Sequence, residues 1–137
     1  MTRQLADVTL DGVTGELVLV NGESAIRRAL AAGAALLASE QVGVAQWCLQ
    51  TTVDYLKERR QFGRVVGGFQ ALKHRLADLF ADVESAGAAA RYAAAILAAG
   101  DPDAEIAATV AQAYCSDLAV KAAEEAIQAA AAGVAGR

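Results

Sequence analysis

The sequence predicts an all-α protein, an up-down bundle of three long helices with a short extended or β arm at its N-terminus. Apolar residues recur at helical spacing from about residue 24 onward. Clustered glycines at 61–69 and the run Gly100-Asp101-Pro102 divide that pattern into three segments. Hydrophobic residues make up 55 % of the chain and aromatic residues only 5 %. The apolar content is therefore mostly alanine, leucine and valine, which favours closely packed helices.

Residues 1–22 differ from the rest of the chain. Apolar and polar residues alternate over 8–11, Asp11-Gly12 is a turn signal, and residues 16–20 form a second short apolar run. This segment is either one or two strands or an extended arm. Because an isolated two-stranded ribbon is marginal in water, we expect it to pack on something else or to be the end of a neighbouring sheet domain.

Three helices follow the arm. The first is predicted from about Ser24 to Arg60 and the second from about Gln70 to Ala99. Gly100 ends the second helix, and Asp101-Pro102 opens a third that runs to about Ala132. The apolar positions expected on the helix faces are Ile26, Leu30, Gly33, Leu37, Val42, Ala45, Leu49, Val53 and Leu56, then Leu72, Leu76, Leu79, Val83, Ala90 and Leu97, then Ile106, Val110, Tyr114 and Ile127.

Three antiparallel helices leave one side of a bundle uncovered, because a standard bundle has four. The sequence therefore predicts an incomplete four-helix bundle that pairs with another chain, and hence an oligomer.

Composition argues against several classes of function. The net charge of −4 and the pI of about 4.9 argue against a nucleic-acid or anionic-membrane partner. No apolar run reaches the ~18 residues of a membrane helix, and Met1 opens no signal-peptide pattern. We therefore expect a cytoplasmic protein.

Single residues with chemical potential are few. Cys48 and Cys115 are expected to be buried free thiols, since their spacing fits no metal site. His74 is the only histidine and is expected at the surface or an interface rather than as a catalytic base. Trp47 and Tyr114 are expected to be packing residues, and no metal site is predicted.

The bend between the first two helices concentrates polar and aromatic groups. Arg59 ends a helix, where a cation is favoured, and its guanidinium can bind a phosphate bidentately. Phe62 can lie against an adenine or a flavin edge, and the glycines at 63, 67 and 68 allow close backbone approach. The alternative interpretation is a plain helix-to-helix turn with a solvated basic end.

The motifs around this bend resemble the carboxy-terminal helical domain of acyl-CoA dehydrogenases. The resemblance rests on Glu40-Gln41-Val42-Gly43-Val44-Ala45-Gln46, Tyr55, Glu58-Arg59-Arg60-Gln61-Phe62-Gly63, Phe69-Gln70-Ala71-Leu72 and Leu76-Ala77-Asp78. Residues 5–13 also resemble the end of the family's middle β-domain, and residues 109–128 resemble its third long helix. The resemblance divides the chain into an arm, 1–22, and a helical domain, 23–137.

The resemblance implies binding of FAD across a subunit interface. It implies that Arg59 contacts the cofactor diphosphate and that Gln61 and Phe62 flank its adenine half. Gln70 is implied to contact the same region, and Gln128 to precede a Gly-Gly pair where the backbone approaches the diphosphate. The implied partners are acyl-CoA dehydrogenase-type subunits, in a homo- or hetero-oligomer.

The chain departs from the family pattern in ways that bear on activity. Residues 129–132 are alanines in place of the Gly-Gly. The position of a glutamate base on the first helix holds Gly33, and Glu40 lies about two turns further along. Ala31 and Ala34 stand where the family often has polar contacts to CoA, and the 137 residues do not include the amino-terminal helical domain or most of the β-domain.

The sequence therefore predicts no catalytic residue and an isolated chain without activity. The predicted function is that of an acyl-CoA dehydrogenase-like, FAD-binding protein associated with α,β-desaturation of acyl-CoA thioesters, with acyl-CoA bound only in a complete assembly. The alternative is a catalytically inactive fragment or subunit that acts as an oligomerisation module.

Overall fold

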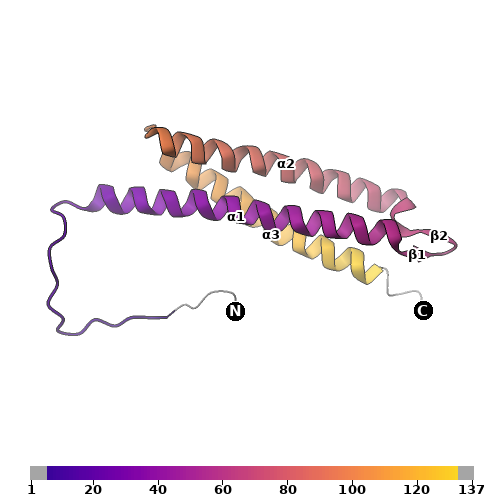
Figure 1. The fold of residues 1–137 in the computed structure, drawn as a ribbon, viewed down its shortest axis with the longest axis horizontal. Coiled ribbons are helices and arrows are strands. Elements are labelled where there is room, and N and C mark those ends of the chain that lie inside the picture. Colours follow the sequence, from indigo (N-terminus) through magenta and orange to yellow (C-terminus); the bar gives the residue numbers. More distant parts are fainter. Residues whose placement is uncertain (1–5, 133–137) are drawn as a thin grey trace.

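The computed structural model describes residues 6–132 and confirms the predicted all-α bundle (Figure 1). Its helices are α1 (Glu23–Glu58), α2 (Gln70–Ala99) and α3 (Ala104–Ala132). Between α1 and α2 lie two short strands, β1 (Arg60–Gln61) and β2 (Arg64–Val65), and the 3-10 turn η1 (Val66–Gly68). The bundle is elongated, since the 36 residues of α1 span about 54 Å.

The predicted helix ends lie close to the observed ones. The second helix has the predicted bounds, and the first begins at Glu23 and ends at Glu58. Gly100 ends α2 in the left-handed conformation, with φ 71°, and its N–H donates to Ile96 and Leu97 carbonyls. The third helix begins at Ala104 rather than at Asp101, because the Asp101 carboxylate accepts the N–H of Asp103 within a preceding turn.

The arm contains no strand over residues 6–22. Its chain bends at Asp11-Gly12, where Gly12 has φ 64°, as the turn signal predicted. The arm side chains lie exposed beside the bundle rather than on it. Of the two alternatives, the described residues match the extended arm, and its relation to a β-domain stays a prediction.

The core is built mainly from alanine, as the composition predicted. Each helix packs against the other two, and α1 packs most extensively against α3. The buried apolar residues include Leu79, Val83 and Leu118, but most are alanines. Small side chains allow the helix backbones to approach closely, so contact between backbones replaces the interdigitation of large side chains.

Several predicted buried positions are wrong. Ile26 and Leu30 are 62 % and 68 % exposed, because α1 turns its alanine face inward and its larger apolar side chains outward. The third helix does the same with Ile106, Val110, Tyr114 and Ile127, all of which are exposed. Trp47 is also exposed, so it is not a packing residue within this chain.

Both cysteines are buried free thiols, as predicted. Burial raises the pKa of the Cys115 thiol, whose Sγ lies 3.7 Å from the Ala86 carbonyl oxygen. Within residues 6–132, no helix combines the length and apolar character that crossing a membrane would require. No cluster of histidine, cysteine and carboxylate side chains suited to a metal ion occurs among the same residues.

Candidate functional site

The bend between α1 and α2 is a tight hairpin. The helix ends at Glu58, and Arg59 takes an extended conformation with φ −66° and ψ 129°. The Arg59 N–H donates to the Tyr55 carbonyl at 3.0 Å, and the Arg59 carbonyl accepts the Val66 N–H at 2.8 Å. Arg60 pairs with Val65 and Gln61 with Arg64 in an antiparallel register. This ladder fixes the path of the chain from one helix to the next.

The tip of the hairpin presents a strained aromatic residue. Phe62 and Gly63 form the two-residue loop with φ 50° and 74°, the pattern of a type I′ turn. Asn-Gly is the usual pair for this turn, because the left-handed conformation costs a residue with a bulky side chain about 1–2 kcal/mol. The Phe62 side chain is 83 % exposed, and burial therefore does not explain its presence. An exposed, strained aromatic residue points to a binding role.

Substitutions at Phe62 should reveal this strain directly. We expect the free energy of unfolding of Phe62→Asn to be about 1 kcal/mol higher than that of Phe62→Ala. Both substitutions remove the ring, but only asparagine tolerates the left-handed conformation. Urea unfolding followed by circular dichroism measures the difference. Equal stabilities for the two variants would show that position 62 carries no backbone strain.

A small apolar cluster supports the bend from below. It consists of buried Leu56, Val66 and Ala129, with half-buried Phe69, Leu72 and Leu76 packed against it. The cluster joins the end of α1, the turn η1, the first part of α2 and the end of α3. Gly67 fits closely over it, since a Cβ at this position would lie 2.9 Å from the Leu56 carbonyl oxygen. The bend and the end of α3 therefore form one corner, which we call the basic corner.

The structure places all five predicted site residues at this end of the bundle. Arg59 follows α1, Gln61 lies on β1 and Phe62 at the tip. Gln70 is the first residue of α2, and its side-chain nitrogen lies 2.6 Å from Nε2 of His74. Gln128 is exposed on α3 and borders a hollow of about 50 Å³ with Leu72 and Arg75.

The residue after Gln128 belongs to the cluster beneath the bend. Ala129 is 6 % exposed and contacts the Leu56 and Val66 cluster. Its methyl group is therefore part of the packing that ties α3 to the bend.

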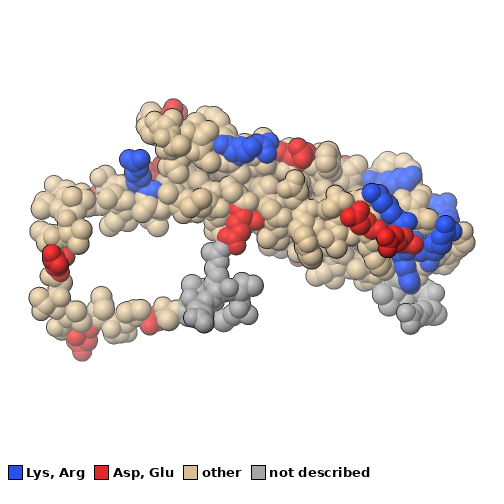
Figure 2. Space-filling model, in the orientation of Figure 1, with Lys and Arg blue, Asp and Glu red and all other residues tan. Residues whose placement is uncertain are grey.

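Cations give the basic corner its name. Residues 57–75 contain six lysines and arginines and a single acid, Glu58, in a chain whose net charge is −4. Figure 2 shows lysine and arginine side chains gathered over the end of the molecule that carries β1 and β2. Some of this charge is paired: Lys57 lies 3.7 Å from Asp54, and Arg75 lies 2.8 Å from Glu125. The hydrogen bond and the charge of Glu125 raise the pKa of the Arg75 guanidinium.

Two residues that the sequence reasoning did not select as site residues complete the corner. Arg64 on β2 places its guanidinium carbon 4.0 Å from the centroid of the Phe69 ring. The Phe69 ring in turn meets Phe62 edge to face, with centroids 6.3 Å apart. No sequence spacing signals a contact between residues 64 and 69, because it depends on the hairpin and η1 turning the chain back on itself.

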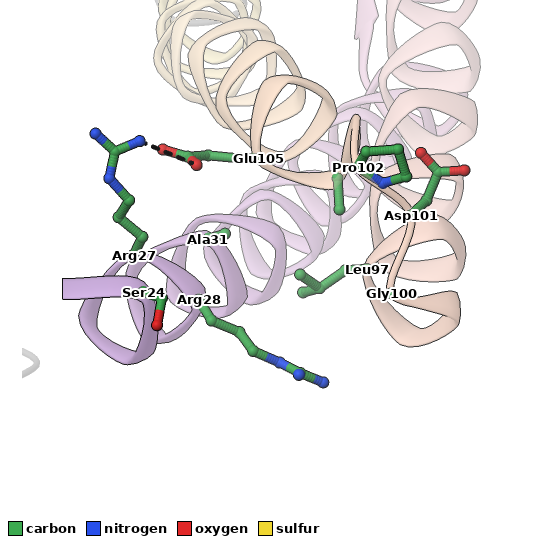
Figure 3. A pocket seen from close by; sticks show the side chains of 10 residues that line it. Ser24, Arg27, Arg28, Ala31, Leu97, Gly100, Asp101, Pro102 and Glu105 are labelled. Carbon is green, nitrogen blue, oxygen red and sulfur yellow. Dashed lines mark ion pairs between the residues drawn. The ribbon is translucent and has the colours of Figure 1, made fainter. Parts of the chain in front are cut away.

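A hollow of about 290 Å³ lies at the opposite end of the bundle, between the start of α1 and the α2–α3 turn (Figure 3). There Arg27 turns toward Glu105 at 3.7 Å and also lies 3.2 Å from Glu23. Arg28 extends away on the other side of α1. With Asp101 also at its rim, this hollow balances two cations against two acids and favours no ligand charge.

The middle of α1 carries no carboxylate at the position considered for a base. Gly33 is exposed, and a Cβ built on it would meet nothing within 4 Å. Glu40 is exposed further along the helix. There is space for a side chain at residue 33, but glycine has none that could act as a base.

Comparisons with known proteins agree with the motifs at the corner. The family described as "Acyl-CoA dehydrogenase, C-terminal domain" matches residues 21–136. Acyl-CoA dehydrogenase IpdE2 of Mycolicibacterium smegmatis is 53 % identical over 87 residues, which cover 63 % of this chain and 25 % of that protein. Acyl-CoA dehydrogenase FadE34 of Mycobacterium tuberculosis is 40 % identical over 127 residues, or 90 % of this chain and 17 % of that protein. The chain thus spans a quarter or less of these curated relatives.

A solved structure shares the arrangement of the helices. It is described as the electron transferring flavoprotein of Acidaminococcus fermentans, in work on flavin-based electron bifurcation. The TM-score is 0.75 at 33 % sequence identity, over 77 % of this chain and 28 % of that one. The likeness in three dimensions therefore extends over most of the bundle.

Proposed function

Because the chain belongs to the acyl-CoA dehydrogenase family, through the C-terminal domain of that family, we propose that its basic corner binds FAD at a subunit interface. FAD would bind in a homo- or hetero-oligomer with acyl-CoA dehydrogenase-type subunits, and this assembly would desaturate acyl-CoA thioesters. Acyl-CoA itself would bind only in that complete assembly.

One observation carries the proposal: Phe62, an exposed aromatic residue with a strained backbone, lies among cations at one end of a molecule whose net charge is negative. Phe62 offers an exposed ring to a purine, and Arg59 precedes the same hairpin three residues earlier in the chain. Residues 57–75 carry six cations and one acid, and even with Asp54, Glu124 and Glu125 beside them the corner keeps an excess of positive charge, which favours an anionic group. A planar base attached to a diphosphate meets both requirements, and this is the adenosine diphosphate half of FAD.

Each of the five residues would contact a part of FAD that suits its chemistry. Arg59 would neutralise the diphosphate, and Phe62 would stack on or against the adenine. Gln61 and Gln70 would donate and accept hydrogen bonds around the same half of the cofactor, with Gln128 on its α3 side. When bound, FAD would supply the hydride acceptor for desaturation. Residues of this chain would hold the distal half of the cofactor and leave the proton transfer to a base elsewhere.

We accordingly propose that the isolated chain is inactive. Gly33 offers no carboxylate, and residues 129–132 are alanines where the family resemblance implies a Gly-Gly pair. An acyl-CoA assay with an artificial electron acceptor tests this statement. Turnover above the no-enzyme background would contradict it.

Nucleotide titrations test the binding proposal. We expect ADP and FAD to shift the amide resonances of Phe62 and Gln70 with similar dissociation constants, while FMN, which lacks the adenosine half, leaves them unchanged. Arg59→Ala should weaken ADP binding about tenfold or more, because a charge-assisted hydrogen bond is lost. Arg28→Ala is the matched control, since it removes one cation at the far end. Equal binding of FMN and ADP would contradict the proposal.

A second candidate function is an interaction module, and a specific feature favours it. A groove of about 320 Å³ between α1 and α3 is bordered by Trp47, Tyr55 and Ile127 and contains no charged side chain. Trp47 and Ile127 are 68 % and 71 % exposed. Exposed large apolar side chains of this kind mark surfaces that another protein covers. Size-exclusion chromatography with light scattering decides between a monomer and an oligomer, and Trp47→Ser should shift any oligomer toward the monomer.

A further inference from the structure

Arg64 makes two contacts that join the hairpin to the start of α2. Its guanidinium carbon lies 4.0 Å from the Phe69 ring centroid, and its Nη2 donates to the Gly68 carbonyl at 2.9 Å. Phe69 immediately precedes α2, and its N–H donates to the Val66 carbonyl at 3.1 Å. A single side chain on β2 therefore holds the end of η1 and the entry to α2.

Through Phe69, the contacts of Arg64 extend to Phe62 at the tip of the hairpin. The Phe69 ring has Arg64 over its face and lies nearly perpendicular to the Phe62 ring, at an interplanar angle of 88°. Backbone strain such as that of Phe62 persists only where surrounding contacts fix the conformation. The ladder has only two residue pairs, Arg60 with Val65 and Gln61 with Arg64, and it fixes the path of the chain rather than the Phe62 side chain. The cation–π contact and the pair of rings add contacts that reach the Phe62 ring.

We propose that Arg64 is a positioning residue for the basic corner: its guanidinium fixes Phe69, and through Phe69 it fixes Phe62 and Gln70 in a preformed arrangement. The assignment of ligand contacts to Phe62 and Gln70 rests on the proposed function. The positioning itself is a property of the free chain and does not depend on any ligand.

The geometry also distinguishes Arg64 from the cations that would meet a phosphate. Its guanidinium face lies on an aromatic ring, and Nη2 is used by a backbone carbonyl of the same chain. A cation–π contact and a short hydrogen bond of this kind depend weakly on salt, whereas a contact between a cation and a mobile anion weakens as salt screens it. Loss of Arg64 should therefore weaken nucleotide binding by more than the loss of its charge alone, and this additional factor should not change with ionic strength.

Amide hydrogen exchange of the free chain is the first test. In Arg64→Ala we expect the amides of Val66 and Phe69 to exchange about tenfold faster, which corresponds to the loss of an exposed cation–π contact and one hydrogen bond. Arg60→Ala is the matched control, because it removes the same charge from the adjacent strand. Core amides such as that of Leu79 should be unchanged in both. Equal exchange in the two variants, or acceleration that includes Leu79, would overturn the proposal.

ADP titrations at low and high sodium chloride are the second test. Arg64→Ala should weaken ADP binding several-fold more than Arg60→Ala, which removes the same charge, and this ratio should be the same at both salt concentrations, while the loss in Arg59→Ala shrinks at high salt. A ratio of Arg64→Ala to Arg60→Ala that shrinks at high salt would make Arg64 a phosphate ligand and overturn the positioning role. If ADP does not bind the wild-type chain, the proposed function fails, and the exchange experiment still decides the role of Arg64.

Discussion

Replacement of Leu56 by alanine is expected to lower the free energy of unfolding by about 3 kcal/mol. Leu56 is 1 % exposed and is the largest buried member of the cluster that joins α1, η1 and the end of α3. Its loss would leave a cavity beneath the hairpin. Urea unfolding followed by circular dichroism measures the change, with the slope of the transition expected to stay constant.

Leu36→Ala is the matched control for this variant. It makes the same substitution on the same helix, but Leu36 is 72 % exposed, so its effect should stay within about 0.5 kcal/mol. Leu56→Ala should also broaden the resonances of Phe62 and Gln70, since the surface that supports them is loosened. A loss below 1 kcal/mol for Leu56→Ala would mean that the corner does not depend on this cluster.

Gly67→Ala is expected to cost about 2 kcal/mol for a different reason, overpacking rather than a cavity. The added methyl group would lie 2.9 Å from the Leu56 carbonyl oxygen and 3.3 Å from its carbon, both backbone atoms. Neither can rotate away, so η1 would have to lift from the end of α1. We therefore expect lower stability together with weaker ADP binding.

The neighbouring glycine provides the control. At Gly68 a Cβ would lie 3.8 Å from Nε of Arg64, an ordinary contact with a flexible side chain. Gly68→Ala should change the stability by no more than about 0.5 kcal/mol. If the two alanine variants unfold at the same urea concentration, the close approach of η1 to α1 is not a constraint on the fold.

The helices could be predicted from the sequence because their ends are marked locally. Gly100 stops α2 in the left-handed conformation, and the glycines at 63, 67 and 68 mark the bend that follows α1. The division between buried and exposed faces was harder to predict. Both sides of α1 are apolar, so spacing alone could not show that Ala31, Ala35 and Ala38 face inward while Ile26 and Leu30 face outward.

The hairpin within the bend was not predicted, although the bend itself was. Asn-Gly is the usual signal for a type I′ turn, and here Phe62 takes the first position at a cost in backbone energy. Local propensity fails at this point because the position is held by tertiary contacts from Arg64 and Phe69. The site residues found from the motif lie together in space, whereas the residue that supports them, Arg64, could be identified only from the structure.

The separation of charge has a consequence for the kinetics of assembly. Residues 57–75 carry a net +5, which leaves −9 on the remainder, and acids such as Asp101, Asp103 and Glu105 lie at the opposite end of a bundle about 54 Å long. The hairpin end is therefore more positive than the rest of the molecule. A partner with an acidic surface would be turned toward the hairpin before any contact forms, so salt should slow the encounter more than it speeds dissociation.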